Sequence, residues 1–247
     1  MQEPVQPVVP FRDSKLAKKE QIEEMFDKIA FRYDFLNHFL SMGIDRSWRR
    51  KALGFLAPGK PRHLLDVATG TADVAVMAAR ILKPARITGV DLSEKMLDIG
   101  RRKIRELQLP VPIELLKADS EALPFEDRSF DAISVAFGVR NFEHLDLGLS
   151  EMLRVLKPGG RLVILEFSRP TAFPVRQLFE AYFRYITPYI GKWFARSKEA
   201  YAYLPESVQA FPQGSQMTDI LTKIGYSDAL CKPLTFGICS IYSASRP

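Results

Sequence analysis

The sequence Leu65-Asp66-Val67-Ala68-Thr69-Gly70-Thr71-Ala72-Asp73 predicts a buried strand that turns directly into a helix. Gly70 supplies the positive φ angle or the close backbone approach that such a turn needs. The dinucleotide fingerprint G-x-G-x-x-G would require glycines where Ala68 and Ala72 stand. We therefore expect a ligand-binding loop without the pyrophosphate cradle of an NAD-dependent oxidoreductase.

Short apolar runs alternate with amphipathic stretches on both sides of this loop. The predicted strands are residues 64–67, 87–90, 113–118, 132–137, 162–167, 226–230 and 238–243. The predicted helices among them are residues 73–82, 93–107, 144–156 and 215–224. This alternation predicts an α/β fold with a mostly parallel, seven-stranded sheet and helices on both faces. Such sheets bind ligands where the carboxyl ends of the strands meet the loops.

Helical spacing also marks two regions outside the sheet. Apolar side chains recur at three- and four-residue steps between residues 14 and 40, so we expect a mobile start over 1–13 and an N-terminal helical cap over 14–58. The remaining domain, 59–247, carries an aromatic helical insertion at about 173–212. Cations flank its apolar side chains, which suits a helix over an apolar channel or on an anionic bilayer. Core packing of a long helix is the alternative.

Composition limits the class of protein further. The chain has 247 residues, 47% of them hydrophobic, which is enough for one large core. Its formal charge of +6 favours binding to nucleic acid, to an anionic membrane or to a negatively charged ligand. It lacks both a secretory signal pattern and an apolar run of about 18 residues, so we expect a cytoplasmic protein. Cys231 and Cys239 have neither disulfide nor metal-site spacing, and the scattered histidines predict no metal site. The histidines are His38, His63 and His144.

Acidic residues end successive strands. Asp91 follows Asp66 by 25 residues and ends the second predicted strand, where it can accept both hydroxyls of a ribose in bonds worth roughly 1.5 to 3 kcal/mol each. Asp119 and Ser120 end the third strand, where an adenine amino group can be recognised. A strand-terminal Asp alone is more often a helix cap or turn residue. Three acidic residues at corresponding positions of three successive strands favour a bound nucleoside.

This constellation resembles the class I S-adenosylmethionine methyltransferases. The resemblance implies S-adenosylmethionine as the cofactor and S-adenosylhomocysteine as the product. It implies that Thr69 and Gly70 lie along the methionine moiety, that Asp91 holds the ribose, and that Asp119 and Ser120 border the adenine. The cofactor-binding residues expected on this basis are Asp66, Thr69, Gly70, Asp91, Asp119 and Ser120.

A closer resemblance is to the menaquinone and ubiquinone biosynthesis C-methyltransferases, and it covers about residue 26 to the C-terminus. Tyr33-Asp34-Phe35-Leu36-Asn37-His38-Phe39-Leu40-Ser41, followed by Trp48, is similar to that family's N-terminal signature. The other similar segments are residues 122–125, 137–142, 154–162, 166–168 and 203–207. The chain departs from the common pattern of this family at Asp45 and Ala136, and from that of the class I methyltransferases at Ala72.

The closer resemblance implies C-methylation of demethylmenaquinol to menaquinol, and the alternative acceptor is a 2-polyprenyl-6-methoxy-1,4-benzoquinol. Alignment of ring and methyl group can supply roughly 7 to 11 kcal/mol. Arg140 and Asn141 follow the fourth strand and are expected to stabilise the developing phenolate, although an Arg in a loop is more often in a surface ion pair. Tyr33 either serves a proton relay or packs in the core, and both interpretations stay open.

A polyprenylated quinol substrate implies transient contact with the inner face of the cytoplasmic membrane. A homodimer is also expected. The basic charge is also typical of enzymes that methylate nucleic acid, which is a rival function. Enzymes that methylate amino groups of nucleic acids typically carry an Asn-Pro-Pro-Tyr-like run after the fourth strand, and residues 137–140 differ from it. We therefore expect no nucleic-acid partner. A non-catalytic S-adenosylmethionine-binding module is the second rival function. The segments similar to the quinone C-methyltransferases, which would bind the methyl acceptor, argue against it.

Overall fold

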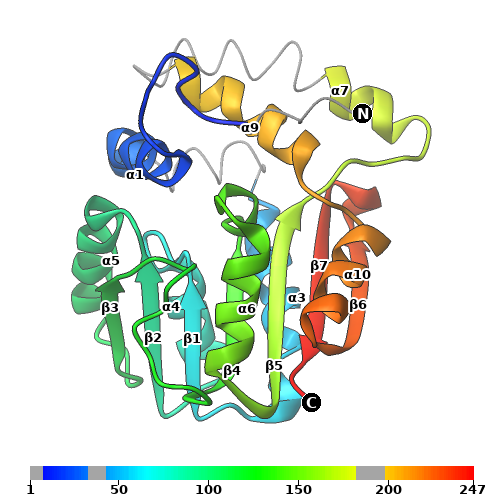
Figure 1. Cartoon of the computed structure of the whole chain (residues 1–247). Helices are drawn as coiled ribbons and strands as arrows, with labels where there is room; N and C mark the ends of the chain where they lie inside the picture. Colours follow the sequence, from blue (N-terminus) through cyan, green and yellow to red (C-terminus); the bar gives the residue numbers. More distant parts are fainter. Residues whose placement is uncertain (1–7, 33–42, 182–197) are drawn as a thin grey trace.

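A single mixed sheet forms the centre of the molecule, in a computed structural model that describes residues 8–32, 43–181 and 198–247 (Figure 1). Its strand order is β3-β2-β1-β4-β5-β7-β6. The strands are β1 (His63–Val67), β2 (Arg86–Asp91), β3 (Ile113–Lys117), β4 (Phe130–Ala136), β5 (Leu156–Phe167), β6 (Ser227–Leu234) and β7 (Cys239–Ser245). The predicted seven-stranded sheet is confirmed.

The direction of chain progression reverses at β1. Strands β1, β2 and β3 pair in parallel on one side, and β4 pairs in parallel with β1 on the other, so that Leu65 lies between Thr88 and Ile133. Strand β7 is antiparallel to both β5 and β6. A sheet of this kind opens a crevice beyond the carboxyl ends of the two strands where the order reverses, here β1 and β4.

Helices cover both faces of the sheet, as predicted. The described helices and 3-10 turns are α1 (Lys18–Ile29), η1 (Ala30–Arg32), α3 (Asp45–Gly54), η2 (Ala57–Gly59), α4 (Asp73–Ile81), α5 (Glu94–Leu107), η3 (Val139–Asn141), α6 (Leu145–Val155), α7 (Val175–Ala181), α9 (Lys198–Ala210), α10 (Ser215–Ile224) and η5 (Thr235–Gly237). Alternate β1 residues enter different cores: Leu64 joins the cluster that includes α3 and α4, and Leu65 joins the one that includes α6 and α10. Helices α1, α7 and α9 lie beyond the carboxyl ends of the parallel strands (Figure 1).

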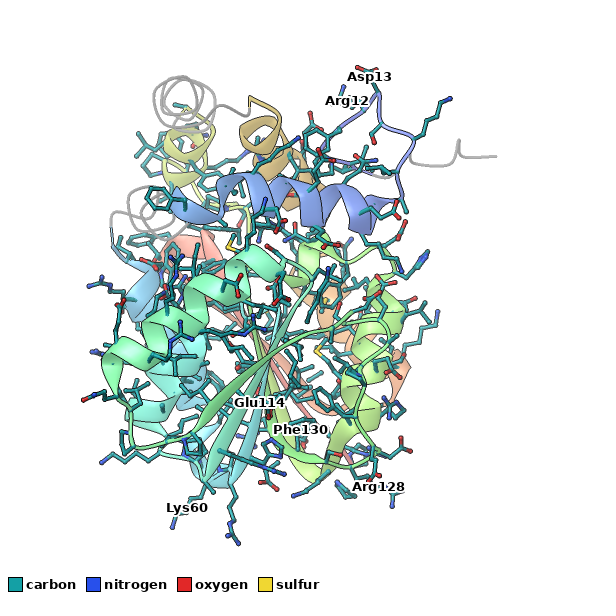
Figure 2. The ribbon with its side chains drawn as sticks, turned by 90° about the vertical axis from the view of Figure 1, so that its left-hand side faces the viewer. Arg12, Asp13, Lys60, Glu114, Arg128 and Phe130 are labelled. Carbon is teal, nitrogen blue, oxygen red and sulfur yellow. The ribbon has the colours of Figure 1, made fainter. Side chains whose placement is uncertain are left out.

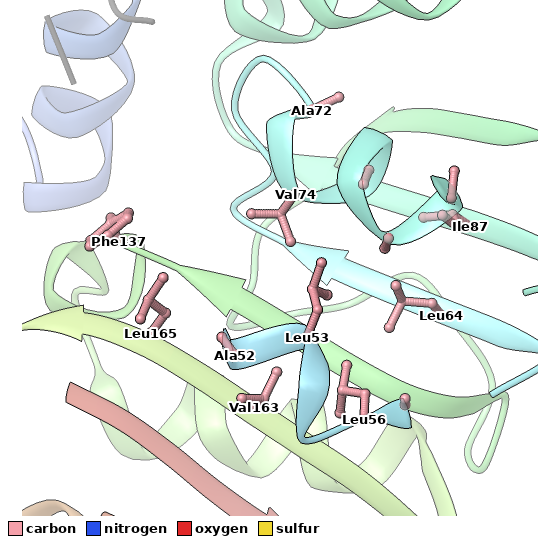
Figure 3. Close-up of a cluster of buried hydrophobic side chains, with 14 of the residues drawn as sticks. Ala52, Leu53, Leu56, Leu64, Ala72, Val74, Ile87, Phe137, Val163 and Leu165 are labelled. Carbon is pink, nitrogen blue, oxygen red and sulfur yellow. The ribbon is translucent and has the colours of Figure 1, made fainter. Parts of the chain in front are cut away.

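Helix α3 belongs to the core of the sheet domain. Leu53 and Leu56 are each only 1% exposed and pack in the same cluster as Leu64 and Val163 (Figure 3). The predicted cap spans residues 14–58, whereas in the structure its second half covers the sheet. Helix α1 lies outside these two cores, and its Ile22 and Met25 form a small apolar cluster with Tyr203 of α9.

Several boundaries differ from the predictions for local reasons. Helix α1 begins at Lys18 because the Glu20 side chain accepts a hydrogen bond from the Ala17 amide, and it ends at Ile29, well before residue 40. Strand β5 begins at Leu156, which pairs with Phe130 ahead of a register shift, and so starts six residues before the predicted strand at 162–167. Residues 33–42 and 182–197, which hold part of the predicted cap and insertion, lie outside the described residues.

Candidate active site

A cleft of about 720 Å³, including its solvent-open part, lies beyond the carboxyl ends of the parallel strands. Four turns supply much of its lining, at Val67, Ala68 and Gly70 after β1 and at residues 90–93 after β2, 118–121 after β3 and 136–138 after β4. Helix α1 supplies another wall. The position, where the strand order reverses, is that of a small-molecule site in an open α/β sheet.

Asp91 joins two of these turns. One oxygen of its carboxylate accepts the Gly70 amide at 2.8 Å, and the other accepts the Ser93 amide at 2.9 Å. Burial raises the pKa of Asp91, against the opposing effect of the backbone amides. An ionised carboxylate has about four acceptor positions, so Asp91 can hold both turns and still accept ligand hydroxyl groups from the cleft.

The turn after β1 has an unusual backbone. Ala68, Gly70 and Ala72 have φ angles of 51°, 56° and 66°, in the left-handed region that L-residues with a Cβ atom seldom adopt. Gly138 approaches this turn so closely that a Cβ atom built on it would lie 2.4 Å from the Cβ atom of Ala68. The turn is therefore held tightly against the end of β4.

The side chains of Asp66 and Thr69 lie on the side of this turn that faces away from the main cleft. The Thr69 and Ser134 hydroxyls each donate to the Asp66 carboxylate at 2.6 Å. Burial raises the pKa of Asp66 to about 6 despite these two bonds and the charge of Arg49. Both Asp66 and Thr69 were expected to bind the cofactor. Their side chains support the turn from within the protein, and both residues line a smaller cavity on its other side instead of the main cleft.

A buried charge cluster fixes the start of α4 next to this smaller cavity. Arg49, whose side chain is 6% exposed, lies 3.0 Å from Asp45 and 2.8 Å from Asp73, and Lys103 lies 2.6 Å from Asp73. Helix α3 is thereby connected to the loop that follows β1. The i,i+4 spacing of Asp45 and Arg49 was the only signal in the sequence for this cluster.

Helix α1 closes the side of the cleft near β2 and β3. Its Lys19 pairs with Asp119 at 3.2 Å, its Glu23 with Lys117 at 2.6 Å, and its Asp27 accepts the Ser93 hydroxyl at 2.6 Å. Figure 2 shows α1 lying across the end of the sheet domain opposite Lys60 and Arg128. Sequence reasoning assigned the N-terminal region to the acceptor and missed this contact with the predicted nucleoside side.

Arg140 and Asn141 lie in η3, directly after β4, but differ in their surroundings. The Arg140 side chain is 8% exposed and pairs at 2.7 Å with Glu166, which is fully buried. It also donates to the Phe137 carbonyl, and Arg140 is not among the residues that line the cleft. Asn141 does line the cleft. Tyr33, the third predicted catalytic residue, lies outside the described residues.

The site can be compared with known proteins. A family model described as the ubiE/COQ5 methyltransferase family matches residues 14–246. The chain belongs to this family. The demethylmenaquinone methyltransferase of Bacteroides fragilis is 50% identical over 93% of this chain and 94% of its own length. The ubiquinone/menaquinone biosynthesis C-methyltransferase of Geotalea daltonii is 45% identical over 94% of this chain and 99% of its own length.

The fold of this methyltransferase agrees with that of solved relatives. An S-adenosylmethionine-dependent methyltransferase from Thermotoga maritima is 20% identical and has a TM-score of 0.62, with coverage of 92% of this chain and 100% of its own. At this level of identity the likeness shows the fold alone. It confirms the predicted Rossmann-like sheet of class I methyltransferases.

Four of the six predicted cofactor residues are brought together in the methyltransferase cleft: Gly70, Asp91, Asp119 and Ser120. Within the described residues, no group of three or more His, Cys, Asp or Glu side chains could hold a metal ion. A bilayer-crossing helix, which needs both length and an apolar sequence, is likewise absent from that part of the chain.

Proposed function

We propose that this methyltransferase transfers a methyl group from S-adenosylmethionine to a ring carbon of demethylmenaquinol, giving menaquinol. The observation that carries the proposal is the joint presence of a cleft around Asp91 at the carboxyl ends of the parallel strands and 50% identity to a demethylmenaquinone methyltransferase over 93% of the chain. The relative from Geotalea daltonii, whose printed name also includes ubiquinone biosynthesis, supports a 2-polyprenyl-6-methoxy-1,4-benzoquinol as a second acceptor.

The residues of the cleft fit the proposed cofactor. Asp91 accepts the ribose hydroxyls, while Asp119 and Ser120, at the end of β3, border the adenine. The apolar side chains of Ile22 and Phe26 line the same cleft from α1 and cover the nucleoside. S-adenosylmethionine, when bound, supplies an electrophilic methyl group on its sulfonium. The chain itself aligns the cofactor with the acceptor through the turn after β1, which the hydrogen bond between Thr69 and Asp66 stabilises.

The acceptor ring is assigned to the β4 side of the cleft. Asn141 faces the cleft there and is proposed to contact a ring oxygen. Arg140 acts through its ion pair with Glu166, which fixes η3 and so positions Asn141. Tyr33 is retained as a candidate for the proton relay. Water is kept from the reacting groups by α1, which closes the adjacent wall.

We also propose that the protein is cytoplasmic and contacts the inner face of the cytoplasmic membrane reversibly, because a quinol with a polyprenyl tail resides there. Large apolar side chains support this: Phe31, Phe173 and Leu178 are 91%, 81% and 67% exposed. They belong to the segments around α1 and α7, which lie at the same end of the molecule (Figure 1). Liposome flotation at low salt tests the proposal, and a protein that stays in solution contradicts it.

The test of the function is turnover. Purified protein is incubated with methyl-labelled S-adenosylmethionine and with each quinol separately, and the products are analysed by mass spectrometry. We expect one added methyl group on the naphthoquinol ring. Binding of S-adenosylhomocysteine is measured on the same sample by calorimetry. A protein that binds the nucleoside but labels neither quinol would exclude the proposed acceptors and leave the cofactor assignment standing.

A further inference from the structure

Tyr203, in α9, has a buried hydroxyl that the fold does not use. The residue is 3% exposed and packs with Ile22 and Met25 of α1. Its hydroxyl has no hydrogen-bond partner among the described residues. Because Ile22 also lines the cleft, Tyr203 lies directly behind the cleft wall.

An unpartnered buried hydroxyl is unfavourable for stability. Moving it from water to an apolar site breaks its hydrogen bonds to water and forms none in return. A phenylalanine would fill the same space without this cost. Two other buried tyrosines of the described residues differ in this respect: Tyr226 donates to the Leu149 carbonyl at 3.0 Å, and the Tyr242 hydroxyl accepts the Gly214 amide at 3.1 Å. Groups that weaken a fold in this way are concentrated at functional sites.

The surroundings of Tyr203 are those of the proposed acceptor site. Helix α9 packs against η3, which carries Arg140 and Asn141. Burial raises the pKa of Tyr203, while the charge of Arg140 lowers it and that of Glu166 raises it, so the hydroxyl lies within the field of both members of this ion pair. At neutral pH the side chain is a neutral phenol and can donate its proton in a hydrogen bond.

A second unpartnered polar atom lies in η3. The Oδ1 atom of Asn141 is buried and has no hydrogen-bond partner among the residues that the structure describes. Asn141 is 8% exposed and belongs to the cleft lining. Tyr203 in α9 therefore offers a hydrogen-bond donor, and Asn141 in the neighbouring η3 offers an acceptor. A quinol ring oxygen accepts hydrogen bonds, and its hydroxyl also donates one.

We propose that the Tyr203 hydroxyl donates a hydrogen bond to a ring oxygen of the acceptor, while Asn141 Oδ1 accepts from a ring hydroxyl. This inference rests on the proposed function and adds Tyr203 as an acceptor-binding residue. A donor aimed at a ring oxygen also stabilises the negative charge that this oxygen gains as its proton leaves. Tyr203 and Asn141 therefore select rings that carry oxygen substituents. They do not discriminate between prenyl tails of different length.

The test is Tyr203→Phe, with Tyr226→Phe as the matched control. For Tyr203→Phe we expect kcat/KM for the quinol to fall at least tenfold, binding of S-adenosylhomocysteine to stay within twofold, and thermal stability to stay equal or rise. For Tyr226→Phe we expect lower thermal stability and unchanged turnover, because the Tyr226 hydroxyl donates to the Leu149 carbonyl and so stabilises the fold. Calorimetry with a short-chain demethylmenaquinol, kept reduced under anaerobic conditions, measures ring binding directly, and Tyr203→Phe should weaken it at least tenfold.

Several outcomes overturn the inference. It fails if Tyr203→Phe binds the naphthoquinol and turns over within twofold of the wild type, or if it loses stability as Tyr226→Phe does, which would indicate a structural hydroxyl. A wild-type protein that binds the naphthoquinol but yields no methylated product refutes the proposed function, and the Tyr203 assignment is then judged on binding alone. A wild-type protein that binds no naphthoquinol refutes both.

Discussion

Replacement of Asp66 by Asn is expected to stabilise the fold and weaken cofactor binding. Burial raises the pKa of this carboxyl from 3.8 to about 6, so the ionised form is disfavoured in the folded protein. A difference of about 2 units at 1.36 kcal/mol each amounts to roughly 3 kcal/mol above pH 7. Asn removes the charge and keeps the shape, so the variant should gain up to that amount.

The gain must depend on pH with a definite sign. The folded protein takes up the Asp66 proton near pH 6 and the unfolded chain only near pH 3.8, so the wild type recovers stability as the pH falls between these values. The advantage of Asp66→Asn should therefore drop to roughly half by pH 5 and vanish below pH 3.8. Chemical denaturation at pH 8 and pH 5 measures it. A variant less stable than the wild type at pH 8, or a gain equal at both pH values, would refute the reasoning.

The same variant should bind S-adenosylhomocysteine more weakly. The Asp66 carboxylate accepts from both Thr69 and Ser134, whereas Asn offers one acceptor oxygen and a donor group, so one hydroxyl must turn away and the loop loosens. Asp131→Asn is the matched control. Burial alone would raise the pKa of Asp131, but Lys157 and the His63 amide outweigh it and hold the pKa below its usual value. That variant should lose stability at pH 8 and keep its cofactor affinity.

Three further substitutions test separate parts of the site. Asp91→Ala should weaken S-adenosylhomocysteine binding about 10- to 100-fold in calorimetry, because it removes charge-assisted hydrogen bonds of roughly 1.5 to 3 kcal/mol. Arg140→Ala should destabilise the protein by about 3 to 5 kcal/mol in urea denaturation, because Glu166 is left buried without its counter-charge; an unchanged midpoint would contradict this. Ala72→Gly should stabilise by up to about 1 kcal/mol in thermal denaturation, because the left-handed φ of 66° is strained for Ala, and a loss would show that its methyl group packs usefully.

The sheet and the cofactor side could be predicted because their signals are local. Strand and helix periods alternate along the chain, and each strand end carries its polar residue. Asp91 and Asp119 were found in this way, and both line the cleft. Asp66 shared the signal, but its side chain is 1% exposed, because Asp66 lies inside β1 and pairs with Gly89, two residues before Asp91, and so does not reach the carboxyl edge of the sheet.

The remainder depends on contacts between distant residues. The pairing of Lys19 with Asp119 spans 100 residues, and no sequence period indicates on which side of the cleft α1 lies. The ion pair of Arg140 and Glu166 likewise forms because β4 and β5 are neighbours in the sheet. The sequence suggested a reactive Arg140, whereas the structure gives it a buried partner. The hydroxyl of Tyr203 became informative only when its lack of a partner could be seen.

The way α1 is attached has a consequence for exchange of the nucleoside. Its ion pairs with the sheet domain are partly open to solvent, with side chains 46% and 24% exposed for Lys19 and Asp119, and 49% and 35% for Lys117 and Glu23. At 1 M salt the Debye length falls to about 3 Å, so such pairs lose most of their attraction, while the apolar core is unaffected by screening. High ionic strength should therefore speed dissociation of S-adenosylhomocysteine in stopped-flow measurements at nearly constant melting temperature.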